Sequence, residues 1–141
     1  MIIKQLSVFL ENQTGRINRV TDILGRYNIN MSAFSVAEGS EFGILRLIVP
    51  DPVLAREVLK NNGIMSTITD VICLITPNKP GALAKALNIL AEQGVFIQYM
   101  YAFSAGETAS VVIKPNDMER CETILKEHSF DLLKADSAYE I

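Results

Sequence analysis

The chain overlays on itself when it is shifted by 66 positions, and this internal repeat is the strongest constraint on its fold. The coinciding pairs are turn residues and apolar helix positions, among them Asn12 and Asn78, Gly15 and Gly81, Ile23 and Ile89, Leu24 and Leu90, Asp51 and Asp117, and Leu59 and Leu125. The order of the predicted elements repeats as well. A sequence of 141 residues with this repeat predicts two small modules, which we place at residues 1–70 and 71–141. No Gly/Ser-rich or Pro-rich linker separates them, so we expect them to pack side by side.

Residues 76–103 carry the clearest local pattern, which begins with a tight turn. Pro77 and Pro80 fix φ in this turn, and we expect Gly81 to permit a close approach of the backbone at the helix entrance. Apolar residues then recur at helical spacing, namely Leu83, Leu87, Leu90 and Ala91. Gly94 is typical of the residue just past a helix end, and a strand is predicted to follow it.

The first half shows the same succession of elements. Residues 2–10 alternate as a half-buried strand, and a helix with an apolar stripe follows. The remaining predicted elements are strands over 31–37 and 44–49, a helix that starts near Pro52 and a strand over 64–75. Each half is therefore predicted to be β-α-β-β-α-β, the order of a ferredoxin-like unit. The predicted fold class is α+β: two such modules, each an antiparallel sheet with both helices on one face.

Part of the second half matches the pattern N-x-P-G-x-L…G-V-x-I, with Asn78, Pro80, Gly81, Leu83, Gly94, Val95 and Ile97. On these residues the chain resembles the ACT domain, a small regulatory module that binds amino acids. The repeat extends the resemblance to a tandem ACT protein over essentially the whole chain. The first half departs from the pattern at Thr14, where the family usually has proline. The resemblance implies a regulatory protein that binds a free amino acid at the contact between its two modules.

The turns before the first helix of each half are candidate ligand-binding segments. A helix N-terminus presents unpaired N–H groups and a partial positive charge, which suit a carboxylate. The side chains of Asn12 and Asn78 either contact the ligand or cap their own helices. The candidate residues are Asn12, Gln13, Thr14 and Gly15 in the first half and Asn78, Lys79, Pro80, Gly81, Ala82 and Leu83 in the second.

A second candidate segment lies at the start of the second strand of each half, where Asn30 and Phe96 occupy equivalent places. The resemblance to ACT domains implies that Asn30 contacts the ligand; the alternatives are a helix C-cap for Asn30 and core packing for Phe96. The segments are Asn30, Met31 and Ser32 in the first half and Phe96, Ile97 and Gln98 in the second. The resemblance also implies that a ligand lies where two modules meet. Asn78 and Gly81 then share a ligand with Asn30, and Asn12 and Gly15 share a weaker site with Phe96.

Charge and hydropathy argue against several other classes of protein. A net charge of −3 gives no general attraction to nucleic acid or to an anionic membrane. The longest apolar run, residues 71–75, is too short to span a membrane, and we expect a cytoplasmic protein. Cys73 and Cys121 lack the spacing of metal ligands and are predicted to be buried, whereas His128 is predicted to lie at the surface.

The sequence shows no metal-binding, cofactor-binding or nucleophile motif, and no acidic pair has a spacing that suggests acid–base catalysis. We therefore predict a protein that is not an enzyme, has no cofactor and binds a free amino acid. Because exposed sheet edges favour association, we predict a homodimer. The alternative is a small regulatory subunit that docks on an amino-acid biosynthetic enzyme.

Overall fold

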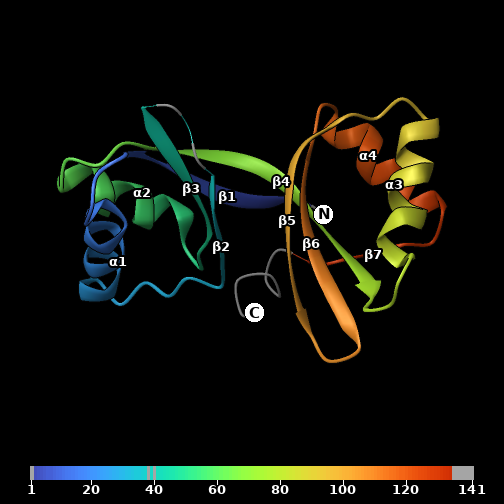
Figure 1. The fold of residues 1–141 in the computed structure, drawn as a ribbon, viewed down its shortest axis with the longest axis horizontal. Coiled ribbons are helices and arrows are strands. Elements are labelled where there is room, and N and C mark those ends of the chain that lie inside the picture. The colour runs from blue at the N-terminus through green and yellow to red at the C-terminus, as the bar shows by residue number, and fades with distance from the viewer. Residues whose placement is uncertain (1, 38, 40, 135–141) are drawn as a thin grey trace. The chain divides into compact units, whose positions relative to one another are not determined.

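The structure, a computed structural model, describes residues 2–37, 39 and 41–134 (Figure 1). Its elements in chain order are β1 (Ile3–Glu11), α1 (Arg16–Arg26), β2 (Ala33–Ala37), β3 (Phe42–Ile48), α2 (Pro52–Asn61), β4 (Ser66–Pro77), α3 (Ala82–Glu92), β5 (Ile97–Ala105), β6 (Thr108–Pro115), α4 (Met118–Glu127) and β7 (Asp131–Leu132). The predicted β-α-β-β-α-β succession is confirmed in both halves. Among the described residues, no helix has the length and apolar character that a membrane crossing requires.

The chain divides into two compact units at a point inside β4. We call residues 4–69 module 1 and residues 70–134 module 2. Residues 2 and 3 group with module 2. The strand β4 therefore contributes its first residues to module 1 and the remainder to module 2, and each module has its own core.

Module 1 is an antiparallel sheet with α1 and α2 on one face (Figure 1). Its strand order is β2-β3-β1-β4, and Leu6 and Phe34 both lie opposite Leu47 of β3. The start of β4 lies beside β1, where the backbone N–H of Phe9 donates to the carbonyl of Met65 over 3.3 Å. Side chains alternate along a strand, so alternate residues of β1 face the helices. The core between sheet and helices includes Leu6, Val8, Leu10, Val20, Ile23, Leu24, Leu45, Leu47, Ala55, Val58 and Leu59.

Module 2 repeats this arrangement, with the strand order β7-β4-β6-β5 and with α3 and α4 on one face (Figure 1). Its core includes Ile72, Leu74, Ala86, Leu90, Val95, Val111, Ile113, Cys121, Ile124 and Leu125. Cys73 and Cys121 are buried free thiols, which confirms the prediction. Burial raises the pKa of each thiol to about 11, because it disfavours the thiolate.

The two helices of each module begin in different ways. α2 and α4 begin at Asp51 and Asp117, whose carboxylates accept hydrogen bonds from backbone N–H groups of the first turn. α1 and α3 begin at Gly15 and Gly81, and no side chain caps either one. A side-chain carboxylate therefore accepts a hydrogen bond from the first turn of α2 and of α4. The first turns of α1 and α3 have no such side-chain acceptor.

Gly15 and Gly81 have left-handed backbones, with φ of +89° and +84°. At neither residue does an atom of the described chain, other than those of the glycine and its two neighbours, lie within 4 Å of the position that a Cβ would take. The expectation that Gly81 permits a close approach of the backbone is therefore wrong. Glycine suits this turn because an L side chain is strained at positive φ.

Several strands begin at different residues from those predicted, and β4 and β5 begin at Ser66 and Ile97 rather than at residues 64 and 95. β2 begins at Ala33 rather than at residue 31, because its register with β3 starts with Ala33 opposite Ile48, the last residue of β3. β3 begins at Phe42 rather than at residue 44, because β1 extends to Glu11, which lies opposite Phe42.

Replacing glycine by alanine should have opposite effects at two positions. Gly81→Ala should lower the free energy of unfolding by about 1–2 kcal/mol, since alanine is strained at positive φ. Gly25→Ala lies inside α1, where φ is not positive and the Cβ position is open, and it should raise this free energy by about 0.5–1 kcal/mol. Urea unfolding measures both variants, and destabilisation of equal size in both would contradict this explanation.

Candidate functional site

The turn before α3 is joined to the β5–β6 hairpin through Asn78. The backbone N–H of Asn78 donates to the carbonyl of Glu107 over 2.7 Å, and its side-chain Nδ2 donates to the carbonyl of Gly106 over 3.2 Å. Residues 78–81 are exposed, whereas Leu83 is half-buried and packs against the core of module 2. The predicted turn residues are thus accessible to a ligand. Leu83, the last residue of the predicted segment, is not fully accessible.

The turn before α1 is built in the same way. The backbone N–H of Asn12 donates to the carbonyl of Glu41 over 3.3 Å, and its Nδ2 donates to the carbonyl of Gly39 over 2.9 Å. Residues 12–15 are exposed. In both modules the asparagine side chain joins the turn to the neighbouring hairpin. The alternative that each asparagine caps its own helix is therefore wrong, and contact with a ligand stays a prediction.

The two kinds of predicted segment lie at opposite ends of each module. β1 and β2 are both antiparallel to β3 and so run in the same direction. Residues 30–32 therefore lie where β1 begins, whereas residues 12–15 lie where β1 ends. The 11 residues of α1 connect these ends, and a helix of that length spans about 16 Å. Within module 1, these two segments are too far apart to contact one small ligand together.

The segment before β2 is partly open to solvent. Asn30 is exposed, and Met31 and Ser32 are half-buried. The left-handed residue after α1 is Asn28, with φ of +55°, so Asn30 is not the C-cap that was its alternative role.

The equivalent segment of module 2 presents an aromatic side chain to solvent. Phe96 is 66% exposed, so the alternative that it packs in the core is wrong. Its backbone N–H donates to Oδ1 of Asn116 over 3.0 Å. Ile97 packs against the core of module 2, and Gln98 is exposed.

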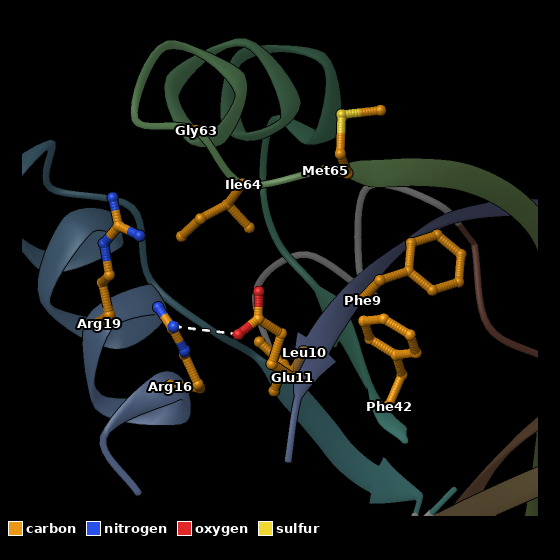
Figure 2. Close-up of a pocket in the computed structure, with 9 residues that line it drawn as sticks. All are labelled: Phe9, Leu10, Glu11, Arg16, Arg19, Phe42, Gly63, Ile64 and Met65. Carbon is orange, nitrogen blue, oxygen red and sulfur yellow. Dashed lines mark hydrogen bonds and ion pairs between the residues drawn. The ribbon is translucent and has the colours of Figure 1, made fainter. Parts of the chain in front are cut away.

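Module 1 contains a cavity of about 230 Å³ where β1 ends and α1 begins (Figure 2). We call it the module 1 cavity; its lining residues come from β1, β3, α1 and the turn before β4, and are Phe9, Leu10, Glu11, Arg16, Arg19, Phe42, Gly63, Ile64 and Met65. None of these was among the predicted site residues.

One side of the module 1 cavity is charged (Figure 2). Nη2 of Arg16 donates to Oε2 of Glu11 over 3.0 Å and to Oε1 of Gln13 over 3.1 Å. Nη2 of Arg19 donates to the carbonyl of Asn62 over 2.6 Å. A guanidinium group carries five N–H donors, so these bonds orient both arginines without using all their donors.

The other side of the module 1 cavity is apolar. The side chains of Phe9, Phe42 and Met65 are 45%, 53% and 70% exposed. Glu11 lies opposite Phe42 in the sheet register, so Phe9 and Phe42 are diagonal neighbours on the sheet face turned away from α1 and α2, a face that Glu11 shares. Figure 2 shows the two rings next to each other, and the side chain of Met65 points away from them.

Module 2 has a larger cavity, of about 550 Å³, at the equivalent place. We call it the module 2 cavity; its lining residues are Ile75, Thr76, Pro77, Asn78, Lys79, Gly106, Glu107, Thr108 and Asp131. It therefore includes Asn78 and Lys79 from the predicted turn. The 66-residue shift pairs Phe9 with Ile75, Leu10 with Thr76, Glu11 with Pro77, Phe42 with Thr108, and Met65 with Asp131.

The sequence contained two signals for the module 1 cavity. The 66-residue overlay shows large differences in polarity at Phe42 and Met65, whose counterparts are Thr108 and Asp131. Arg16 and Arg19 are three residues apart, which is the spacing of neighbours on one helix face. A search for matching pairs in the repeat does not find Phe42 and Met65, because the two halves differ at these positions.

The family model described as "ACT domain pair" matches residues 1–141, the whole chain. The crystal structure of protein BT0572 from Bacteroides thetaiotaomicron is similar to this chain at 50% sequence identity and a TM-score of 0.96, over 100% of this chain and 98% of that one. No match was found to a curated protein.

Regulatory subunits of aspartate kinase share the fold at lower identity. The ligand-free subunit from Thermus thermophilus has 17% identity and a TM-score of 0.66, over 87% of this chain and 88% of that one. The subunit from Thermus flavus has 17% identity and a TM-score of 0.64, over 89% and 92% of the two chains. The fold is a pair of ACT modules of the α+β class.

Removing the side-chain link between Asn78 and its hairpin should destabilise module 2. Asn78→Ala loses one hydrogen bond, and we expect the free energy of unfolding to fall by about 0.5–1.5 kcal/mol. Asn88→Ala, at an exposed position of α3, is the control and should be neutral or slightly stabilising, because alanine favours helix. Urea unfolding compares the two, and equal stability of both variants would mean that the link contributes nothing.

Proposed function

We propose, since this chain belongs to the ACT domain pair family, that it is a regulatory protein whose ligand is a free amino acid. The observation that carries this proposal is the difference between the helix starts of each module. Asp51 and Asp117 cap α2 and α4, whereas α1 and α3 begin at glycine without a side-chain cap. The helix ends without a side-chain cap lie at equivalent places in the repeat; residues of α1 line the module 1 cavity, and Asn78 and Lys79 of the turn before α3 line the module 2 cavity.

The chemistry of these helix ends suits the carboxylate of an amino acid. The first N–H groups of a helix have no carbonyl partner within the helix, and they carry partial positive charge. Small anions bind at such ends. In module 2 the exposed turn adds the ammonium group of Lys79, which lines the module 2 cavity. An ACT domain pair is a regulatory kind of domain, so ligand binding has to act on a partner or on the assembly.

Two arrangements are compatible with this function. A free-standing sensor would be stabilised by its ligand alone, whereas a small subunit of an amino-acid biosynthetic enzyme would also co-purify with that enzyme. The likeness in fold to separate regulatory subunits of aspartate kinase is the reason to test the second arrangement.

An amino acid should raise the thermal stability of the purified protein. At 100 times its dissociation constant, a ligand that binds only the folded state adds about 2.7 kcal/mol to the free energy of unfolding. A thermal-shift screen of the common amino acids, with the matching amino-acid amides as controls, measures this. If no amino acid shifts the melting temperature at millimolar concentration, the proposed function is wrong.

The same ligand tests the predicted pairing of Asn78 with Asn30. Asn78→Ala and Asn30→Ala should each weaken binding by about tenfold or more, because each removes a hydrogen bond to a charged group. Asn12→Ala should matter less. Titration calorimetry measures the affinity of the three variants. An unchanged affinity in Asn30→Ala would mean that the turn residues form the site without Asn30.

We also propose a homodimer. β2 and β5 are the end strands of the described sheet order, so each has one neighbouring strand there. Unpaired strand edges favour association. Light scattering at micromolar concentration should report twice the mass of the chain, and a monomer at this concentration would overturn the proposal.

A further inference from the structure

The module 1 and module 2 cavities occupy equivalent places in the repeat but differ in chemistry. Apolar Phe42 and Met65 of module 1 correspond to Thr108 and Asp131 of module 2, and Glu11 corresponds to Pro77. Each cavity lies where the first strand of a module ends, but a residue of the following helix lines only the module 1 cavity. The difference in lining therefore points to a difference in ligand.

We propose that the module 1 cavity binds an α-amino acid with a large apolar side chain. The carboxylate lies against Arg16 and Arg19, the ammonium group against Glu11, and the apolar side chain against Phe9 and Phe42. This inference rests on the proposed function for the general class of ligand, and it adds the kind of side chain and the residues that recognise it.

The charges at the start of α1 favour a bound anion and do not stabilise the helix. The first turn of α1 contains no acidic residue, and Arg16 and Arg19 place two positive charges near the positive end of the helix dipole. Glu11 neutralises part of this charge through its bond to Arg16. A ligand carboxylate neutralises the remainder, and arginine binds carboxylates with two parallel hydrogen bonds.

The hydrogen bonds of Arg16 and Arg19 fix the positions of their guanidinium groups beside the cavity. Arg19 is bonded to the carbonyl of Asn62, next to Gly63 in the cavity lining. The side chains of Arg16 and Glu11 are 36% and 54% exposed, so both remain accessible from the cavity. The ammonium group of an amino acid therefore finds a carboxylate close to the two guanidinium groups.

The apolar side of the cavity determines the side chain of the ligand. Phe9 and Phe42 are 45% and 53% exposed, and a ligand side chain placed against them would remove apolar surface from water. The cavity volume of about 230 Å³ is below the roughly 300–1,000 Å³ of pockets for drug-sized ligands, so a nucleotide is too large. A single amino acid with an aromatic or long aliphatic side chain is of suitable size.

Titration calorimetry on the full chain tests the proposal with L-phenylalanine as the probe. Two analogues each lack one charged group: 3-phenylpropanoate has no ammonium group, and 2-phenylethylamine has no carboxylate. We expect each to bind at least tenfold more weakly than phenylalanine, and we expect L-alanine to bind weakly because it lacks the apolar side chain. Equal binding of phenylalanine and 2-phenylethylamine would overturn the role of the arginines.

Two variants with matched controls locate the site. Phe42→Thr introduces the residue type of module 2 at an exposed position, and Phe34→Thr makes the same change at an exposed position of β2 outside the cavity. Arg19→Gln removes one guanidinium group, and Arg26→Gln removes one at the other end of α1. We expect Phe42→Thr and Arg19→Gln each to weaken phenylalanine binding about tenfold or more, and both controls to bind as the unchanged protein does. Urea unfolding confirms that all four variants are folded.

The outcomes separate this inference from the proposed function. If phenylalanine binds but Phe42→Thr and Arg19→Gln leave its affinity unchanged, the site lies elsewhere and the inference is wrong. If only small or polar amino acids bind, and Asn78→Ala weakens them, the proposed function stands and the inference is wrong. If no amino acid binds, both are wrong.

Discussion

In each module a left-handed glycine turns the chain from the first strand into the first helix, and an asparagine three residues earlier ties that turn to the neighbouring hairpin. Gly15 and Gly81 have φ of +89° and +84°, and Asn12 and Asn78 donate to hairpin carbonyls over 2.9 and 3.2 Å. The turn sets the direction in which the helix leaves the strand, and with it the helix face that packs on the sheet. Because the hairpin is bonded to the same turn, the cavity beside it has walls that are fixed by the backbone.

This arrangement leaves the lining of each cavity free to change without cost to the core. Phe42 and Met65 are exposed, and so are their counterparts Thr108 and Asp131. Surface substitutions of this kind usually change stability by less than about 0.5 kcal/mol. The buried positions of the helices stay apolar in both halves, with Leu24 and Leu90 both fully buried and Val20 replaced by Ala86. Duplication therefore yields one scaffold with two chemically different cavities.

The sequence predicted the order of elements well and the interactions of single side chains poorly. Helices and strands follow from apolar periodicity, which depends on many residues together, so the repeat of β-α-β-β-α-β was reliable. The role of Asn78 depends on which acceptor lies closest to its amide, and that acceptor, the carbonyl of Gly106, is 28 residues away. Core packing was the alternative role for Phe96, a ligand-binding candidate, and it is wrong because this residue is 66% exposed. The module 1 cavity joins residues from four separate elements, and no local pattern brings those together.

The helix ends show where stability and binding oppose each other. A side-chain cap contributes about 0.5–2 kcal/mol to a helix, and Asp51 and Asp117 supply one where α2 and α4 begin. An aspartate at Gly15 or Gly81 would be strained by the positive φ, and its carboxylate would occupy the N–H groups and repel an anion beside them. The start of α1 is less favourable still for the helix, since Arg16 and Arg19 add positive charge where the helix dipole disfavours it. The proposed anionic ligand would explain why the start of α1, at the edge of a cavity, has an arrangement that weakens the isolated helix.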